Sequence, residues 1–328
     1  MRLYFRLIVS FLILVFLGNP GMAAPAQQKS YKIGYILTLD SQLGAGAKTF
    51  ADEVAKRTGG RIHIEQEPDS ALGGEMEMLK GIQQGTVDIA FITGAPLPNI
   101  LPEAGVFNVP FIFRDTAHAY AVLDGPIGKS YLDKFKEKDM VALAWGENGW
   151  RQITNSKRPL KGPEDLKGLK LRLPQSDVML TGFKALGAEV ASLPFPQLYG
   201  ALQSGQFDGQ ENPIATILSA KFSQVQKYLT ISGHVYDPAV VVVSKDVWGE
   251  ISEADKAIFL EAAKAGAKAS RAFAAEAQKN GVEALKKQGM EVIDQVDRAK
   301  FVAALQGVMP DYAKKFGPEV MAAIQNTK

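Results

Sequence analysis

Short runs that alternate between apolar and polar residues are separated by longer amphipathic segments along most of the chain. The runs at 31–37, 61–67 and 87–93 (YKIGYIL, RIHIEQE and VDIAFIT) have the two-residue period typical of strands. The segments at 44–60 and 73–85 have helical composition and end at glycines. Strands that alternate with helices at this spacing predict an α/β layer with largely parallel strands.

The same order returns in the middle of the chain. The runs RQITN (151–155), LKLRL (169–173) and EVASL (189–193) are predicted strands, and residues 176–187 and 195–205 are predicted helices. The whole chain has 328 residues, which favours about two domains. No low-complexity linker separates them, so we expect two lobes that exchange strands.

A short internal repeat supports this division. The heptapeptides IQQGTVD (82–88) and LQSGQFD (202–208) share one pattern, in which a helix ends at a glycine and a strand follows an aspartate. Gly85 and Gly205 are predicted to adopt the left-handed conformation of a helix C-cap. The match predicts two lobes built alike, although seven residues can also agree by chance.

The last third of the chain is predicted to be helical. Residues 252–289 are rich in Ala, Lys and Glu and contain no proline, a composition that favours a helix. At 1.5 Å per residue, roughly 30 residues of such a helix span about 45 Å and could cross both lobes. Gly281 is expected to kink or divide it, and two shorter helices are expected at about 296–310 and 317–327.

The first residues have the features of an export signal. MRLYFR carries two arginines, LIVSFLILVFL is apolar, and small residues follow. This order predicts a secretory signal peptide over residues 1–23, with an uncleaved membrane anchor as the alternative. The apolar run is short for a membrane span. No later stretch is apolar enough to span, so the mature protein is expected to be periplasmic and not embedded in the membrane.

The charges are balanced once this segment is removed. The chain has 37 Lys and Arg against 35 Asp and Glu, and removal of Arg2 and Arg6 leaves 35 of each. A balanced chain has no bulk attraction for nucleic acid or anionic lipid, so no nucleic-acid partner is predicted. There is no cysteine, which excludes disulfides and attachment through a lipidated cysteine.

Sequence signatures of catalysis are missing. His63, His118 and His234 have no ligand spacing and cysteine is absent, so no metal or other cofactor is predicted. The chain has no G-x-S-x-G elbow. The stretch LGAGAKT (43–49) has the composition of a phosphate loop but lacks its spacing. We therefore predict that the protein is not an enzyme; a periplasmic hydrolase or lyase for an acidic substrate is the alternative.

Two arginines and an amide are candidates for binding an anion. Arg151 and Arg172 lie on predicted short strands, and Arg172 comes just before Pro174. Asn212 follows Gln210 in the motif DGQENP, close to a predicted strand end. The planar guanidinium binds a carboxylate through two parallel hydrogen bonds. A structural salt bridge remains an equal alternative for each arginine.

Other candidates have ordinary structural alternatives. Phe195, Tyr199 and Trp150 could line a pocket, but aromatic residues at such spacing are also typical of a core. Glu75 begins a predicted helix, where a carboxylate is favoured by the helix dipole, so a capping role is the alternative to ligand binding.

Three segments together resemble a known family. They are TGGRIHIEQEPDSALGGEMEMLKGIQQGTVDIAF, GWRQITNSKRPLKGPEDLKGLKLRLPQS and ALGAEVASLPFPQLYGALQSGQFDGQENP. They resemble the solute-binding proteins of TRAP (tripartite ATP-independent periplasmic) transporters, from about residue 31 to about 250. The resemblance implies capture of a small organic acid, such as a sugar acid or a C4-dicarboxylate. It implies delivery to a membrane permease of small and large subunits; a receptor that presents the ligand to a sensor is the alternative.

The resemblance also assigns roles to individual residues. It implies that Arg172 pairs with the ligand carboxylate, that Arg151 is a second polar contact and that Asn212 completes the carboxylate site. It implies that Phe195 is a pocket aromatic and that Glu75 reaches ligand hydroxyls.

The fold implied is a two-lobe (Venus-flytrap) periplasmic binding protein of the α/β class, expected to be monomeric. It has mixed sheets, hinge strands near 148–151 and 233–238, and a long helix that bridges both lobes. The loop TLDSQLG (38–44) offers no evident ligand group. The expected boundaries are 31–148 plus about 238–275 for lobe I, and 149–237 plus about 276–328 for lobe II.

Overall fold

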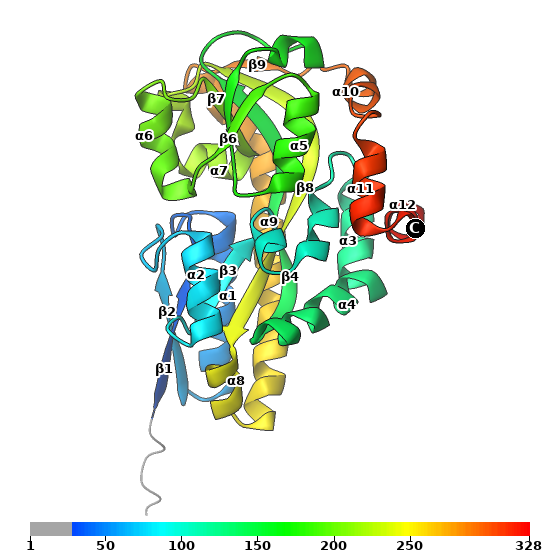
Figure 1. Ribbon diagram of the computed structural model, residues 1–328. Coiled ribbons are helices and arrows are strands. Elements are labelled where there is room, and N and C mark those ends of the chain that lie inside the picture. The colour runs from blue at the N-terminus through cyan, green and yellow to red at the C-terminus, as the bar shows by residue number, and fades with distance from the viewer. Residues whose placement is uncertain (1–27) are drawn as a thin grey trace, which may run out of the picture.

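The computed structural model describes residues 28–328, which form two lobes one above the other (Figure 1). The signal peptide predicted for residues 1–23 lies outside the described residues. Within the described part, no helix is both long and apolar enough to cross a membrane. We call the lower group of elements in Figure 1 lobe I and the upper group lobe II.

Lobe I begins with three strands and two helices in alternation. They are β1 (Lys29–Gly34), α1 (Gln42–Arg57), β2 (Ile62–Glu67), α2 (Glu75–Gln84) and β3 (Ile89–Thr93). Strand β1 lies in the middle and pairs in parallel with both β2 and β3. This confirms the α/β alternation that the hydrophobic pattern predicts.

Lobe II repeats this arrangement with its own set of elements. They are β5 (Lys170–Leu173), α5 (Asp177–Ala185), β6 (Glu189–Ser192), α6 (Leu198–Gln203) and β7 (Gly209–Pro213). Strand β5 again lies in the middle and pairs in parallel with β6 and β7. A single helical turn precedes α6, and α7 (Ile214–Ser219) follows β7 directly.

The two heptapeptides that match in sequence have the same role in the two lobes. Gly85 and Gly205 end helices α2 and α6 with left-handed φ angles of 70° and 74°. The carboxylates of Asp88 and Asp208 then accept a backbone hydrogen bond from the central strand of their own lobe. The donors are the N–H of Lys32 at 2.9 Å and that of Lys170 at 3.0 Å. The internal repeat is therefore structural rather than accidental.

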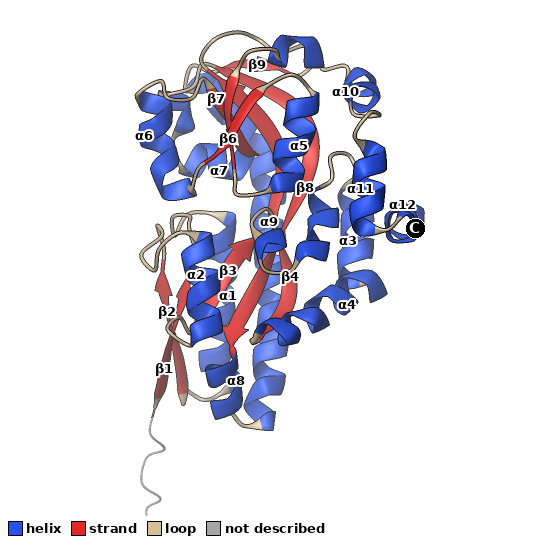
Figure 2. Ribbon diagram, viewed as in Figure 1, coloured by secondary structure: helices blue, strands red, loops and turns tan. Residues whose placement is uncertain are grey.

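Two long antiparallel strands pass through both lobes (Figure 2). They are β4 (Met140–Asn155) and β8 (Tyr228–Ser244). In lobe I, β8 pairs with β3, and in lobe II β4 pairs with β7 and β8 pairs with β9 (Glu291–Ile293). The strand order β2-β1-β3-β8-β4-β7-β5-β6 mixes parallel and antiparallel pairs, which confirms a mixed sheet. The sequence pattern indicated only the last third of β4.

The long helix is the third element that crosses both lobes (Figure 1). Helix α9 (Glu253–Lys287) has 35 residues, and it packs against α1 in lobe I and against α7 in lobe II. The expected division at Gly281 is wrong, because α9 continues through this residue. A Cβ atom at Gly281 would lie 2.5 Å from Cγ2 of Ile214, so glycine permits close packing of α9 against α7.

The segment between β3 and β4 contains α3 (Thr116–Asp124) and α4 (Pro126–Lys134), and β8 is followed by the short helix α8 (Lys245–Glu250). The chain ends in three helices, not two: α10 (Arg298–Ala304), α11 (Met309–Phe316) and α12 (Pro318–Asn326).

The expected helix over 296–310 stops early because the chain turns after Leu305, and α11 begins at Met309 with Pro310 in its first turn. Gly317, with a φ of 89°, separates the last two helices. The N–H groups of Arg114 and the ring of His118, from the region of α3, hold the carbonyls of Thr327 and Ile324 at 2.8 and 2.7 Å. The C-terminal helices are therefore tied to α3.

Each lobe has its own apolar core. The core of lobe I contains large buried side chains such as Phe91 and Phe107. The sheet of lobe II has one cluster on each side, the first with Leu171 and Phe183 and the second with Phe222. Separate cores allow each lobe to stay rigid while the boundary between them is lined with polar groups.

Candidate functional site

Arg172 is a buried cation on β5 that forms no salt bridge with the residues the structure describes. Its neighbours Leu171 and Leu173 are fully buried in the lobe II core, and Arg172 itself is 2% exposed. Within residues 28–328 its side chain forms one hydrogen bond, from Nε to the carbonyl oxygen of Leu193 at 2.8 Å, and no salt bridge. Its two terminal nitrogens therefore have no protein acceptor in the described part of the chain.

The electrostatic surroundings of Arg172 are unfavourable for its charge. Burial lowers the pKa of Arg172 to about 9, and the positive charge of Arg151 acts in the same direction. The carboxylates of Glu211 and Glu75 oppose this shift only in part. A buried cation with incomplete compensation is stabilised by a nearby anion. The site is therefore suited to receive a negatively charged group.

Arg151, in contrast, is paired with protein carboxylates. It donates from Nε and NH2 to the two carboxylate oxygens of Glu211, and from NH1 to Oδ2 of Asp237 at 2.7 Å. The charges of Glu211 and Asp237 outweigh burial and raise the pKa of Arg151, although burial is the largest single influence. The salt bridge that the sequence allowed as an alternative is therefore present at Arg151. Contact of Arg151 with a ligand remains a prediction.

Asn212 and Gln210 extend from β7 towards the same region. Gln210 lies opposite Arg172 in the parallel pair of β5 and β7, so both side chains share one face of the sheet with Asn212. Oδ1 of Asn212 accepts from NH2 of Arg151 at 3.2 Å, and its Nδ2 donates to Oε1 of Gln210 at 2.6 Å. Gln210 then donates to Thr154 at 2.8 Å. Arg151 thus fixes which end of the Asn212 amide is a donor.

Glu75 brings a carboxylate from lobe I. It is the first residue of α2, and its oxygens accept from the N–H of Thr93 at 2.7 Å and from the Thr93 hydroxyl at 3.1 Å. Burial raises the pKa of Glu75 to about 7 despite these two hydrogen bonds, and Asp237 adds to the shift. Glu77, and not Glu75, accepts the N–H of Gly74 at this end of the helix, so the hydrogen bonds of the Glu75 carboxylate go to Thr93 on β3.

The two lobes meet next to these groups. A Cβ atom at Gly74, beside Glu75, would lie 3.9 Å from the rings of both Pro194 and Pro196 of lobe II. Nearby, Nδ2 of Asn99 in lobe I donates to the carbonyl of Gln175 in lobe II at 2.7 Å. Carboxylate, amide and guanidinium groups from both lobes therefore converge on one boundary.

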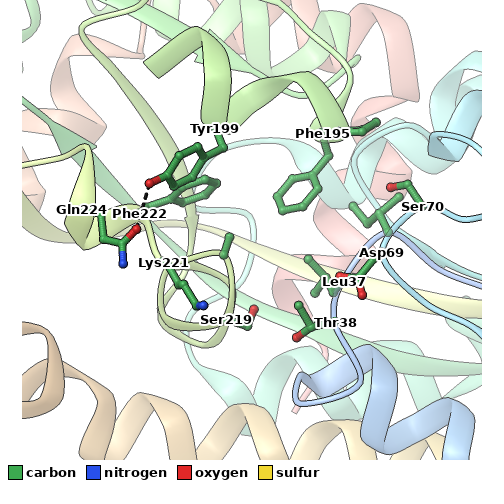
Figure 3. Close-up of a pocket in the computed structure, with 13 residues that line it drawn as sticks. Leu37, Thr38, Asp69, Ser70, Phe195, Tyr199, Ser219, Lys221, Phe222 and Gln224 are labelled. Carbon is green, nitrogen blue, oxygen red and sulfur yellow. Dashed lines mark hydrogen bonds between the residues drawn. The ribbon is translucent and has the colours of Figure 1, made fainter. Parts of the chain in front are cut away.

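Phe195 and Tyr199 line a cavity of about 360 Å³ at this boundary (Figure 3). Leu37 and Asp69 line it from lobe I, and the Tyr199 hydroxyl donates to Gln224 at 2.9 Å on the lobe II side. Arg172, Asn212, Gln210 and Glu75 are not among the residues that line it. The segment 193–195 joins the two parts, because Leu193 holds the Arg172 side chain and Phe195 faces the cavity.

Trp150 does not belong to this group. Its indole donates to Oγ1 of Thr116 at 2.9 Å, and its ring lies edge-on to Tyr236 at 5.4 Å. It lines a smaller cavity, of about 180 Å³, together with Ala274 of α9. This cavity also lies between the lobes, because Thr116 lines it from lobe I and Ile214 lines it from lobe II. Of the eight predicted residues, Phe195 and Tyr199 therefore line the larger cavity, and Trp150 lines this separate one.

Sequence reasoning missed the buried groups that support the site. Glu211 accepts from Arg151 and lies 3.1 Å from Nε2 of His234, whose pKa is lowered by burial. Asp237 accepts from both Arg151 and Asn148. The motif DGQENP contains Glu211 and the expected hinge contains Asp237, but a chain rich in carboxylates gives no reason to select these two. No cluster suited to a metal ion occurs among residues 28–328.

Comparison with known proteins identifies the family. The model of the bacterial extracellular solute-binding protein family 7 (DctP) matches residues 33–315. A TRAP periplasmic solute-binding protein from Polaromonas sp. JS666, bound to D-erythronate, is 46% identical with a TM-score of 0.91 and covers 92% of this chain and 99% of its own. The chain belongs to the TRAP solute-binding proteins.

Two further relatives agree with this assignment. A TRAP solute-binding protein from Bordetella bronchiseptica, with density assigned to pantoate, is 45% identical with a TM-score of 0.90 and covers 92% of this chain and all of its own, 100%. The 2,3-diketo-L-gulonate-binding periplasmic protein YiaO of Escherichia coli K12 is 35% identical over 291 residues, 89% of each chain. The two-lobe fold and the solute-binding role expected from the sequence are confirmed. The family is periplasmic, binds small organic acids and works with TRAP permease components.

Proposed function

We propose that this TRAP solute-binding protein captures a short 2-hydroxy monocarboxylate in the periplasm. It is exported through a signal peptide at residues 1–23, binds the acid by lobe closure and delivers it, as a monomer, to a permease of small and large subunits. It binds the acid without altering it and so does not act as an enzyme. The observation that carries this proposal is the buried Arg172 guanidinium with no protein counter-ion in the described residues.

One available guanidinium favours a ligand with one carboxylate. Arg151 has its three nitrogens directed at Glu211, Asp237 and Asn212, whereas Arg172 uses only Nε. A hydrogen bond to a charged group contributes about 1.5–3 kcal/mol net, and a guanidinium can make two to one carboxylate. A second carboxylate on the ligand would find no second buried and unpaired guanidinium among residues 28–328, because the cation that lines the cavity, Lys221, is an exposed ammonium.

The other groups at the boundary favour hydroxyls next to that carboxylate. Asn212 offers an amide N–H, and Glu75 offers a carboxylate from the opposite lobe. The acids named for the two similar structures, D-erythronate and pantoate, are both monocarboxylates with hydroxyls on carbons 2 and 4 of a four-carbon backbone. We therefore propose this class, which includes the shortest sugar acids, as the substrate.

Closure follows from ligand groups that lie on different lobes. Arg172 and Asn212 belong to lobe II and Glu75 belongs to lobe I, so an acid contacts all three only when the lobes meet. Binding then shifts the population towards the closed form. The hinge near 148–151 and 233–238 is supported by register shifts of β4 against β8 between Glu147 and Gly149 and between Arg151 and Ile153.

The same proposal covers the lobe boundaries. The crossing of β4 and β8 supports the changes of lobe near 148 and 238 in the division into 31–148 plus about 238–275, and 149–237 plus about 276–328. The last two helices depart from this division, because Tyr312 and Ile324 pack in the core of lobe I.

The test is calorimetry with D-erythronate, pantoate and succinate on the mature protein. We expect the two hydroxy monocarboxylates to bind at micromolar concentration or tighter and succinate to bind at least tenfold more weakly. Arg172→Met should abolish binding, whereas Arg57→Met on the surface of α1 should not change it. Equal binding by Arg172→Met would refute the assignment of the site. Recovery of unchanged acid by NMR after incubation checks the non-enzymatic role.

A further inference from the structure

A buried glutamine links the two lobes beside the hinge. Gln42 is the first residue of α1 in lobe I and is fully buried. Its Nε2 lies 2.7 Å from Oδ1 and 3.1 Å from the carbonyl oxygen of Asn148, in the middle of β4. The same nitrogen lies 2.9 Å from Oγ1 of Thr216, on α7 of lobe II. One amide of lobe I therefore contacts both a crossing strand and the opposite lobe.

The contact continues to the acid-binding groups through buried side chains. Nδ2 of Asn148 donates to Oδ2 of Asp237 at 2.7 Å, and the same oxygen accepts from NH1 of Arg151 at 2.7 Å. NH2 of Arg151 then donates to Oδ1 of Asn212 at 3.2 Å. All five side chains, including Gln42, are at most 4% exposed. An unbroken chain of hydrogen bonds thus runs from lobe I to Asn212.

Stability alone does not explain this series of buried hydrogen bonds. Oε1 of Gln42 and Oδ1 of Asp237 are buried without a partner among the described residues, and an unpaired buried acceptor costs free energy. An apolar side chain of similar length at position 42 would avoid this cost. The Gln42 amide is oriented so that its donor nitrogen, Nε2, is surrounded by three acceptors. The retained polar group therefore has a role in the link between the lobes.

We propose that Gln42 is a positioning residue that couples lobe closure to the orientation of Asn212. Gln42 does not touch the acid. In the closed form it keeps the hydrogen bonds between Asn148, Asp237 and Arg151 formed. Arg151 then donates to Oδ1 of Asn212, so Nδ2 of Asn212 is the end of the amide that faces an anion. Opening at the hinge separates Gln42 from lobe II and relaxes this order. The inference rests on the proposed function, because it concerns the same acid site.

Removal of the Gln42 amide would act on the lobe I end of the chain. Oγ1 of Thr216 lies 3.4 Å from Oδ1 of Asn148, so the contact between α7 and β4 persists without Gln42. The hydrogen bonds that are lost are therefore those of α1 with β4 and with α7. We expect Gln42→Met to weaken the closed form while the lobes keep their folds.

The experiment compares Gln42→Met with the wild type and with Gln84→Met, the same change at an exposed position of α2. Calorimetry and stopped-flow kinetics with D-erythronate should give about tenfold weaker binding by Gln42→Met, mainly through faster dissociation. Lobe closure is followed by a fluorophore pair on Lys80→Cys and Lys184→Cys, which are exposed on opposite lobes of a chain without cysteine. Gln42→Met should show a smaller closed fraction with and without the acid.

A double-mutant cycle with Thr216→Val provides the second measurement. Coupled residues give non-additive changes in affinity and in closed fraction, so Gln42→Met and Thr216→Val should not add. If Gln42→Met does not fold, Thr216→Val alone should show the smaller closed fraction. Wild-type affinity and wild-type closure in the variants, or strictly additive changes, would overturn the inference. Failure of the wild type to bind D-erythronate would instead count against the proposed substrate, and the closed fraction without acid would still decide the role of Gln42.

Discussion

Replacement of Glu75 by glutamine should change how the stability of the protein depends on pH. Burial raises the pKa of Glu75 to about 7 from an ordinary value of 4.5. The folded state therefore binds more protons than the unfolded state between pH 4.5 and 7, and the free energy of unfolding falls as the pH rises through that window. A glutamine is neutral throughout and keeps an oxygen for the Thr93 N–H.

The size of the effect follows from the shift. One pKa unit corresponds to 1.36 kcal/mol, so a shift of about 2.5 units corresponds to about 3 kcal/mol once Glu75 is fully ionised. Glu75→Gln should therefore exceed the wild type in stability by up to about 3 kcal/mol at pH 8, and the difference should vanish near pH 4.5. Glu147 and Asp237, whose pKa values burial also raises, titrate in both proteins, so the difference reports Glu75 together with its charge coupling to Asp237.

The assay is urea denaturation of wild type and Glu75→Gln at pH 5, 6, 7 and 8, with exposed Glu65→Gln as the matched control. The affinity for the acid, measured at the same pH values, is a second test. A ligand hydroxyl that donates to the carboxylate favours its ionised form, so the wild-type affinity for D-erythronate should rise from pH 6 to pH 8. The same rise should be absent from Glu75→Gln. Parallel stability curves for wild type and Glu75→Gln would refute the reasoning.

Two further changes test the support of the site and the bridging helix. Arg151→Met leaves Glu211 and Asp237 buried without their cation, and the free energy of unfolding at pH 7 should fall by about 3–5 kcal/mol in urea denaturation; a loss below 1 kcal/mol would contradict the salt bridge. Gly281→Val inserts a side chain against α7 and should lower stability by about 1–3 kcal/mol or more. Gly307→Val, in open space, should cost much less, and equal losses would contradict the packing.

The local elements of this fold could be predicted because their signals are local. Alternating strands, amphipathic helices and glycine C-caps each depend on a few neighbouring residues, as the left-handed Gly85 and Gly205 illustrate. The long strands β4 and β8 could not be predicted in full, because their middle sections change partners between lobes and carry no simple alternation. The close packing of α9 at Gly281 against Ile214 could not be predicted, because only the tertiary structure brings these two residues together.

The site shows the same division between local and long-range information. Sequence reasoning selected both Arg151 and Arg172 but could not separate them, because their fates depend on carboxylates about 60 and 86 residues away from Arg151. The separate position of Trp150 could not be predicted for the same reason, because the surroundings of a strand residue depend on the partners of that strand. Gln42 falls in the stretch 38–44, which is predicted to be a loop without an evident ligand group but contains the start of α1. Its contacts with Asn148 and Thr216 are visible only in the tertiary structure.

The most direct test of the central claim is a crystal structure of the mature protein with D-erythronate. We expect one carboxylate between the lobes, with its oxygens about 2.7–2.9 Å from the two terminal nitrogens of Arg172, and Arg151 still paired with Glu211. An acid bound elsewhere, or an Arg172 side chain turned to a protein carboxylate while the acid is bound, would contradict it.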